Sequence, residues 1–169
     1  QLKSSALRAV RARIIEQYPP IEEIIDELFP KKSPVFLYKC SNHTNLLVHN
    51  KVPLFFSIRD SPYIPTLRLV HQYPGIMEGK VIQIDKGAIP FVLGGANVMS
   101  PGLTNPGGYL TDGLEENDIV VIRAHEKEFE IGLGMMKLST DVIRDTKKDT
   151  GVTLLHHIND GLWRTETMN

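Results

Sequence analysis

Leu93–Gly108 reads LGGANVMSPGLTNPGG and contains five glycines and two prolines, but no Lys, Arg, Asp or Glu. A glycine within a helix or strand costs about 0.5–1 kcal/mol relative to alanine. Five glycines in so short a stretch therefore indicate that the backbone turns sharply there, or that it approaches another group closely.

The composition of this stretch leaves two interpretations open. It has neither the GxxxxGK[ST] nor the GxGxxG spacing of nucleotide-binding loops. A glycine-rich backbone can still bring N–H groups close to a phosphate, a ribose or an unstacked base. The alternative is a turn that closes a small barrel, in which the glycines only bend the strand.

The residues around this stretch have strand-like patterns and predict a small β-barrel or curled sheet. The expected strands are 80–85, 118–125 and 129–139. Pro90 permits only a short helix before the glycines. Ser139 is expected to cap a helix that Gly151 closes. Two last short strands are expected around the turn NDG at 159–161.

The first half of the chain predicts a mixed α/β domain. Residues 4–18 carry apolar side chains at three- and four-residue spacing, which is typical of a helix with one buried face. The other elements expected are a short helix at 21–29, strands at 35–40, 46–49 and 53–58, and a helix at 65–73 with Pro65 in its first turn. The predicted fold class is therefore α+β.

The segment Tyr73-Pro74-Gly75 breaks the chain and predicts a domain boundary, with an N-terminal domain over 1–78 and a C-terminal domain over 79–169. The first part carries ten Lys and Arg against seven Asp and Glu, and the second carries nine against thirteen. This asymmetry indicates two units with different surfaces. Neither has the strongly basic composition of a protein that holds nucleic acid by charge alone.

The overall composition is that of a globular protein. Hydrophobic residues make up 41% of the chain and charged residues 23%, which excludes a disordered or collagen-like protein. No apolar run approaches the roughly 20 residues that a membrane helix needs. Cys40 is the only cysteine, so it cannot form an internal disulfide, and we expect a cytoplasmic localisation without membrane association.

No pattern in the sequence predicts a metal, a cofactor or a catalytic centre. Cys40 and His43 stand three residues apart, but a zinc site needs about four ligands. His156 and His157 point to opposite faces if their segment is a strand. A nucleophilic cysteine or serine also needs a base and an orienting group, and no local signature supplies them.

Two groups of basic residues are ambiguous. Arg8, Arg11 and Arg13 crowd the polar side of the first helix, and no acidic residue precedes Glu16. Lys31 and Lys32 follow the second helix. Both groups could lie against RNA phosphates or simply be solvated.

The ordered series DKGAIPFVLGGANVMSPGLT, ENDIVVI, IGLGMMKLS and NDGLW resembles the PUA domain, a small pseudo-barrel named for pseudouridine synthase and archaeosine transglycosylase. Together with QLKSSALRAVRARIIEQYP and SPYIPTLRLVHQYP, it resembles the malignant T-cell-amplified-sequence family over essentially all 169 residues.

The resemblance implies a translation factor that is not an enzyme. Members of this family pair with density-regulated protein, and the heterodimer binds the small ribosomal subunit. The pair promotes reinitiation, recycling of the subunit after termination, and delivery or release of tRNA. The N-terminal domain is expected on the ribosomal RNA side, and the PUA barrel near the tRNA acceptor end.

The resemblance also implies an RNA-contacting surface on the barrel. The expected residues are Lys86, Gly94, Gly95, Ala96, Asn97, Met99, Pro101, Gly102, Leu103 and Thr104, with Met136 and Lys137 as neighbours. Met99, Leu103 and Met136 are expected to support bases, and the two lysines to neutralise one phosphate each. For the ribosome, the expected contacts are Arg8, Arg11, Arg13, Lys31 and Lys32.

Two alternatives from other classes stay open. PUA barrels are often appended to RNA-modifying enzymes, so the chain could be such an enzyme or its detached targeting module. A pseudouridine synthase needs a catalytic aspartate in a sizeable domain, and the first half offers only Asp26 and Asp60, neither in a catalytic setting. The other alternative is a protein-interaction scaffold whose barrel never touches RNA.

Overall fold

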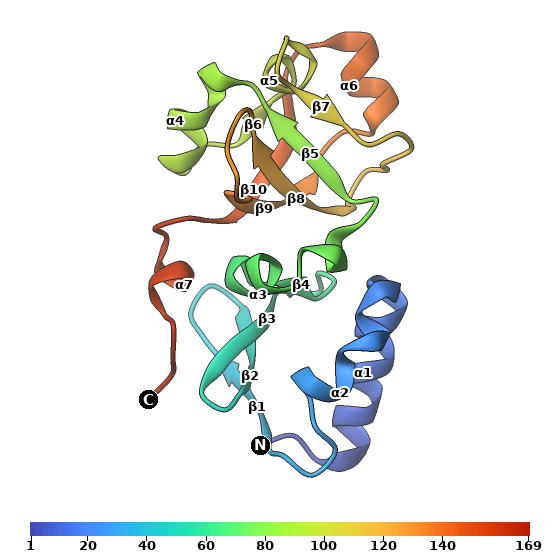
Figure 1. Ribbon diagram of the computed structural model, residues 1–169, viewed down its shortest axis with the longest axis vertical. Coiled ribbons are helices and arrows are strands. Elements are labelled where there is room, and N and C mark those ends of the chain that lie inside the picture. The colour runs from blue at the N-terminus through green and yellow to red at the C-terminus, as the bar shows by residue number, and fades with distance from the viewer. The chain divides into compact units, whose positions relative to one another are not determined.

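The computed structural model describes residues 1–169 and divides into two compact units (Figure 1). Unit 1 comprises Gln1–Ile76 and Thr165–Asn169, and unit 2 comprises Met77–Arg164. Each unit combines helices with a sheet, so the predicted α+β class is confirmed. No helix is both long enough and apolar enough to cross a bilayer.

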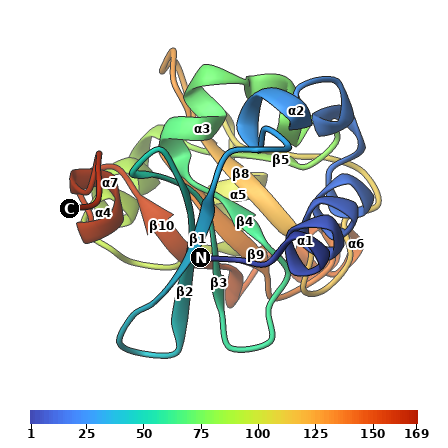
Figure 2. The same cartoon turned by 90° about the horizontal axis from the view of Figure 1, so that it is seen from below.

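Unit 1 is built on a four-stranded antiparallel sheet of order β1-β2-β3-β4, whose first three strands run side by side in Figure 2. Its elements are α1 (Ser4–Gln17), η1 (Pro19–Glu23), α2 (Ile25–Leu28), β1 (Val35–Lys39), β2 (Thr44–His49), β3 (Val52–Ile58), β4 (Ile64–Pro65), α3 (Leu67–Gln72) and η2 (Pro74–Met77), where η denotes a 3-10 helix.

An aromatic cluster joins the helices of unit 1 to its sheet. The rings of Tyr18 and Phe29 lie 6.3 and 6.1 Å from the ring of Phe55 on β3, and all three are buried. The Tyr18 hydroxyl donates a hydrogen bond to the carbonyl of Tyr63. Burial raises the pKa of Tyr18, so this group stays a neutral donor.

Two expectations for unit 1 are wrong in detail. The segment predicted as one helix over 21–29 is a 3-10 helix followed by one turn of α-helix, separated at Ile24. Prolines 19 and 20 open the segment without N–H groups, which favours a short, tight turn. Pro65 lies in β4, at the edge of the sheet where its missing N–H is tolerated. Thr66 caps α3 instead, accepting a hydrogen bond from the backbone N–H of Leu69 at 3.3 Å.

Unit 2 is a curled six-stranded sheet of order β6-β10-β9-β8-β5-β7, in which only β5 and β8 pair in parallel. Its elements are β5 (Val81–Ile84), η3 (Lys86–Ala88), α4 (Ile89–Leu93), β6 (Val98–Met99), α5 (Ser100–Thr104), β7 (Tyr109–Leu110), β8 (Ile119–Ala124), β9 (Gly132–Met136), α6 (Thr140–Thr146), β10 (Thr150–His157) and α7 (Gly161–Arg164). Helices α4 and α6 lie at opposite ends of this unit (Figure 1).

The core of unit 2 collects apolar side chains from nearly every strand. Ile82, Ile122 and Val152 on three strands are fully buried, together with Val98 on β6 and Ile143 on α6. Strand β8 begins with the apolar run IVVI, which is buried throughout, whereas β5 alternates half-buried and buried side chains. The sheet therefore fixes where the segments between β5 and β8 lie.

The C-terminal part of unit 2 corrects two further expectations. Lys147, in the left-handed conformation (φ 53°), ends α6, whereas Gly151 lies within β10. The NDG segment begins a helix and not a hairpin. Asp160 accepts hydrogen bonds from the backbone N–H groups of Trp163 (2.8 Å) and His157 (2.9 Å), which fixes the start of α7.

The glycine-rich stretch at 93–108 is more ordered than a loop, because it contains β6 and α5. Gly108 shows why glycine is needed there. A Cβ added to it would lie 2.6 Å from the carbonyl carbon and oxygen of Leu103. Backbone atoms cannot move away as a flexible side chain can, so this position accepts no side chain.

We therefore predict that Gly108→Ala lowers the free energy of unfolding of unit 2 by about 1–3 kcal/mol through overpacking. Urea unfolding followed by the fluorescence of Trp163, the single tryptophan, measures this change. Gly161→Ala is the matched control, because a Cβ there meets nothing within 4 Å. Equal stability of the Gly108 variant and the wild type would contradict the close packing.

Candidate nucleic-acid interface

The structure divides the residues expected to contact RNA by their exposure. Lys86, Gly94, Gly95, Ala96, Asn97, Met99, Pro101 and Lys137 are exposed, and Thr104 is half-buried. Gly102, Leu103 and Met136 are buried. The Leu103 and Met136 side chains belong to the core, with Met136 at 0% exposure, so they do not support bases as the sequence led us to expect.

Short backbone hydrogen bonds bring part of this set together. The N–H of Asp85 donates to the carbonyl of Gly102 at 2.8 Å, and the Asp85 carboxylate accepts from the N–H of Ala88 and the side-chain amide of Asn105. Lys86, which follows Asp85 in η3, is thereby held near α5. Strand β10 lies between β6 and β9, and its register places Met99 and Lys137 on either side of it.

The turn after α4 does not display free N–H groups. Gly94, Gly95 and Ala96 donate their backbone N–H groups to the carbonyls of Pro90, Val92 and Phe91 at 2.9–3.0 Å. Gly95 has a positive φ of 96°, which closes this turn. Because these donors are already used by the helix end, they do not form the phosphate cradle that the glycine content had left open.

Asn97 has a structural role as well as an exposed position. Its side-chain oxygen accepts a hydrogen bond from the backbone N–H of Leu154 at 2.9 Å. This bond ties the turn after α4 to β10. Asn97 therefore positions the neighbouring surface, and its side-chain oxygen is already engaged.

The structure adds two residues that the sequence reasoning missed. Phe91 is 69% exposed and Leu93 is 39% exposed on α4. Together with Ala96 and Met99, which follow α4, we call them the α4 patch: four exposed apolar residues within nine positions of the chain. Ile89 and Val92 occupy the buried face of the same helix. A five-residue helix with apolar side chains on both faces was the signal that could have revealed the patch.

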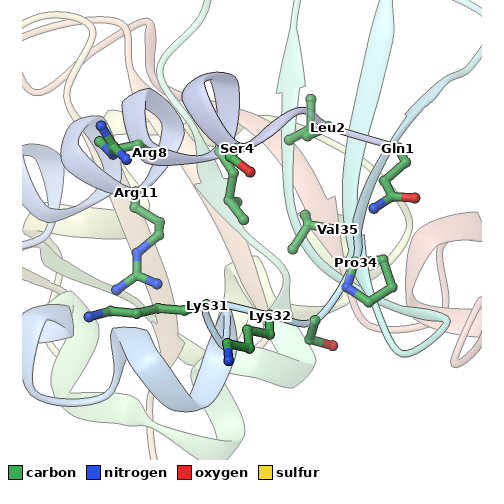
Figure 3. A pocket seen from close by; sticks show the side chains of 11 residues that line it. Gln1, Leu2, Ser4, Arg8, Arg11, Lys31, Lys32, Pro34 and Val35 are labelled. Atoms are coloured by element: carbon green, nitrogen blue, oxygen red, sulfur yellow. The ribbon is translucent and has the colours of Figure 1, made fainter.

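A second candidate surface lies in unit 1, where four basic residues surround one hollow of about 700 Å³ (Figure 3). Arg8 and Arg11 come from α1, and Lys31 and Lys32 precede β1. Arg13, the fifth expected residue, lines a separate hollow of about 270 Å³ with Arg59. The structure thus brings four of the five together.

Arg11 differs from the other three because it is held by the fold. Its guanidinium pairs with Asp26 and donates to the carbonyl of Phe29 at 2.7 Å, and its side chain is 18% exposed. Arg8, Lys31 and Lys32 are exposed and make no ion pair. Only these three offer charges that are not already neutralised.

The other candidate residues have local roles. His156 is buried and its Nδ1 lies 2.8 Å from Asp160 Oδ2. Burial opposes ionisation of Asp160, but the hydrogen bonds from His156 and two backbone N–H groups outweigh it, and the pKa of Asp160 is lowered. Cys40 is an exposed free thiol. No three His, Cys, Asp or Glu side chains converge in a way that could hold a metal ion.

We predict that Arg11→Gln lowers the free energy of unfolding of unit 1 by about 1 kcal/mol, because it removes a charged hydrogen bond to a backbone carbonyl and a partly exposed ion pair. Arg8→Gln, on the same helix, is expected to stay within about 0.5 kcal/mol of the wild type. Urea unfolding followed by far-UV circular dichroism compares the two. If both variants unfold alike, Arg11 does not have the structural role described.

Both units correspond to known domains. A model of the Pre-PUA-like domain matches residues 1–74, and a model of the PUA domain matches residues 80–158. A hypothetical protein from Pyrococcus horikoshii has a similar solved structure, with a TM-score of 0.77, 22% identity and coverage of 98% of each chain. At that identity the likeness concerns the fold alone.

Curated sequences match nearly the whole chain. It is 42% identical over 167 residues to malignant T-cell-amplified sequence 1-A of Xenopus laevis, covering 99% of this chain and 91% of the relative. It is also 42% identical over 168 residues to the malignant T-cell-amplified sequence 1 homolog of Dictyostelium discoideum, with the same coverage.

Proposed function

The chain belongs to the malignant T-cell-amplified-sequence family, and on this premise we propose that it is a non-enzymatic translation factor that binds RNA through its PUA domain. The curated relatives and the two domain matches confirm the family resemblance seen in the sequence. In the proposed role the protein pairs with density-regulated protein, binds the small ribosomal subunit in the cytoplasm, and promotes reinitiation, recycling and tRNA delivery or release.

The observation that carries the RNA part of the proposal is the α4 patch. Exposed apolar side chains such as Phe91 and Met99 provide surfaces on which unstacked bases can rest. Lys86 on η3 and Lys137, just after β9, are exposed and make no ion pair, and the Lys137 backbone N–H is hydrogen-bonded to β10. This surface can therefore contact a few bases and one or two phosphates.

The charge of the second half of the chain favours a single-stranded end over a duplex. Residues 79–169 carry nine Lys and Arg against thirteen Asp and Glu. A long duplex presents many phosphates, and its binding depends on neutralising them. The unpaired acceptor end of a tRNA presents few, so we propose that the PUA domain contacts the tRNA there.

The hollow lined by Arg8, Lys31 and Lys32 is the proposed contact with ribosomal RNA. Its three unpaired cations supply the charge that the PUA surface lacks. Arg11 supports this surface by holding α1 to the segment that ends in Phe29. Arg13 remains a proposed contact on a different part of α1.

An RNA-modifying activity is the alternative. Asp26 is engaged with Arg11, and Asp60 lines one hollow with Arg59 and a second that also includes His43. Incubating the protein with tRNA and mapping modified nucleotides tests this alternative, and any new modification would favour it over the proposed role.

We predict that Ala96→Glu weakens the tRNA-dependent association with reconstituted small subunits about tenfold, because it places a charge within the apolar patch where bases would rest. The effect is expected with intact tRNA and not with tRNA that lacks its 3′-terminal CCA. Val142→Glu adds the same charge to exposed α6, at the other end of the unit, and serves as the matched control. Unchanged binding by the Ala96 variant would remove the patch from the proposal.

We predict that replacing Arg8 and Lys32 together with Gln reduces the salt dependence of small-subunit binding. Each lost phosphate contact lowers the slope of log K against log[salt] by about 0.7–0.9. Lys39→Gln, an exposed lysine on β1 outside this hollow, is the control. A slope identical to that of the wild type would place these cations in solvent.

A further inference from the structure

A separate hollow of about 380 Å³ lies in unit 2 between the end of α5, strand β7 and helix α6. Its wall includes Tyr109, Arg144 and Lys147, and of its lining residues only Leu103 and Thr104 belong to the surface expected from the sequence. Ligand-binding clefts commonly range from about 300 to 1,000 Å³. Since α6 and α4 lie at opposite ends of the unit (Figure 1), this hollow is distinct from the α4 patch.

Tyr109 places an aromatic ring at this hollow from a well-fixed position. It lies on β7, the outermost strand, where it pairs with Gln83 of β5, and its ring is half exposed. The close packing of Gly108 on Leu103 fixes the backbone just before it. The backbone that carries the ring is therefore fixed before any ligand arrives, which lowers the entropic cost of stacking.

Two cations line the hollow: Arg144 on α6, and Lys147 at the C-terminal cap of that helix. The Arg144 guanidinium donates to Asp112 Oδ1 at 2.6 Å and to the carbonyl of Leu110 at 3.0 Å, so it is both positioned and neutralised. Lys147 ends α6 in the left-handed conformation, is exposed and makes no ion pair. The hollow thus offers one aromatic face and one uncompensated positive charge.

We propose that this hollow is a subsite for one nucleotide of a single-stranded RNA, with the base stacked on Tyr109 and the phosphate beside Lys147. The inference rests on the proposed RNA-binding function and adds a second contact to it. A stacked base needs an aromatic face but no particular hydrogen-bond pattern. The Tyr109 ring in the wall of the hollow provides such a face. An acidic peptide fits less well, because it presents several carboxylates, whereas the wall of the hollow offers one cation that is not in an ion pair.

Fluorescence anisotropy with a short fluorescein-labelled poly(U) oligonucleotide and the full chain tests the proposal. Tyr109→Ala is expected to weaken binding about tenfold, and Tyr109→Phe to preserve it, because the ring alone stacks. Lys147→Gln is expected to lower the salt slope by about 0.7, as one phosphate contact on a single strand requires. Lys148→Gln, the adjacent exposed lysine outside the hollow, is the matched control and is expected to leave the slope unchanged.

The outcomes separate this inference from the proposed function. If Ala96→Glu weakens oligonucleotide binding while Tyr109→Ala and Lys147→Gln do not, the subsite is wrong and the RNA-binding function stands. If the wild type does not bind the oligonucleotide, both fail. If Tyr109→Ala weakens binding of a labelled poly-glutamate peptide but not of poly(U), the hollow is a protein contact and the inference is overturned.

Discussion

Unit 2 depends on the close approach of two backbone segments, where the chain after α5 turns back onto it. Gly108 stands where a Cβ would lie 2.6 Å from the carbonyl of Leu103, and Gly102 stands where a Cβ would lie 3.2 Å from the side chain of Ala88. These contacts let α5 pack against β5 through the bond from Asp85 to Gly102. The same packing holds η3 beside α5 and fixes β7, so it positions Lys86 on one element and Tyr109 on another.

Because of this constraint, the glycines have structural roles and are not the groups that would contact a ligand. Glycines at 94 and 95 donate their N–H groups to the end of α4, and those at 102 and 108 serve packing. The surface left for a ligand consists of apolar side chains and isolated lysines. Such a surface gains free energy from burying bases and little from phosphates, and this is the physical basis for proposing a single-stranded end as its target.

Much of the fold could be predicted from the sequence, because it follows from periodicity. The apolar spacing of Leu7 and Ile14 predicted α1, and Ser139 was correctly predicted to cap α6 with a side-chain acceptor. Contacts between distant residues could not be predicted. The burial of Met136 depends on the partner strands of β9, and the exposure of Phe91 depends on which face of a five-residue helix meets the core. The structural role of Arg11 depends on Asp26, fifteen residues away.

The charges of the two units favour different roles in the proposed function: unit 1 supplies charge-based binding of RNA, and unit 2 contacts the unpaired bases. A site with one or two lysines and an apolar patch binds weakly by itself, since association must first offset the loss of translational and rotational freedom. Once a basic contact on the same chain has bound, binding of the RNA end at the apolar patch becomes effectively intramolecular, because the local concentration of that end is raised. Arg8, Lys31 and Lys32 supply that basic contact in the proposed function, while the acidic balance of the other half disfavours binding along a duplex. In the proposed function, specificity for an unpaired end follows from keeping strong charge off the surface that is proposed to contact the bases.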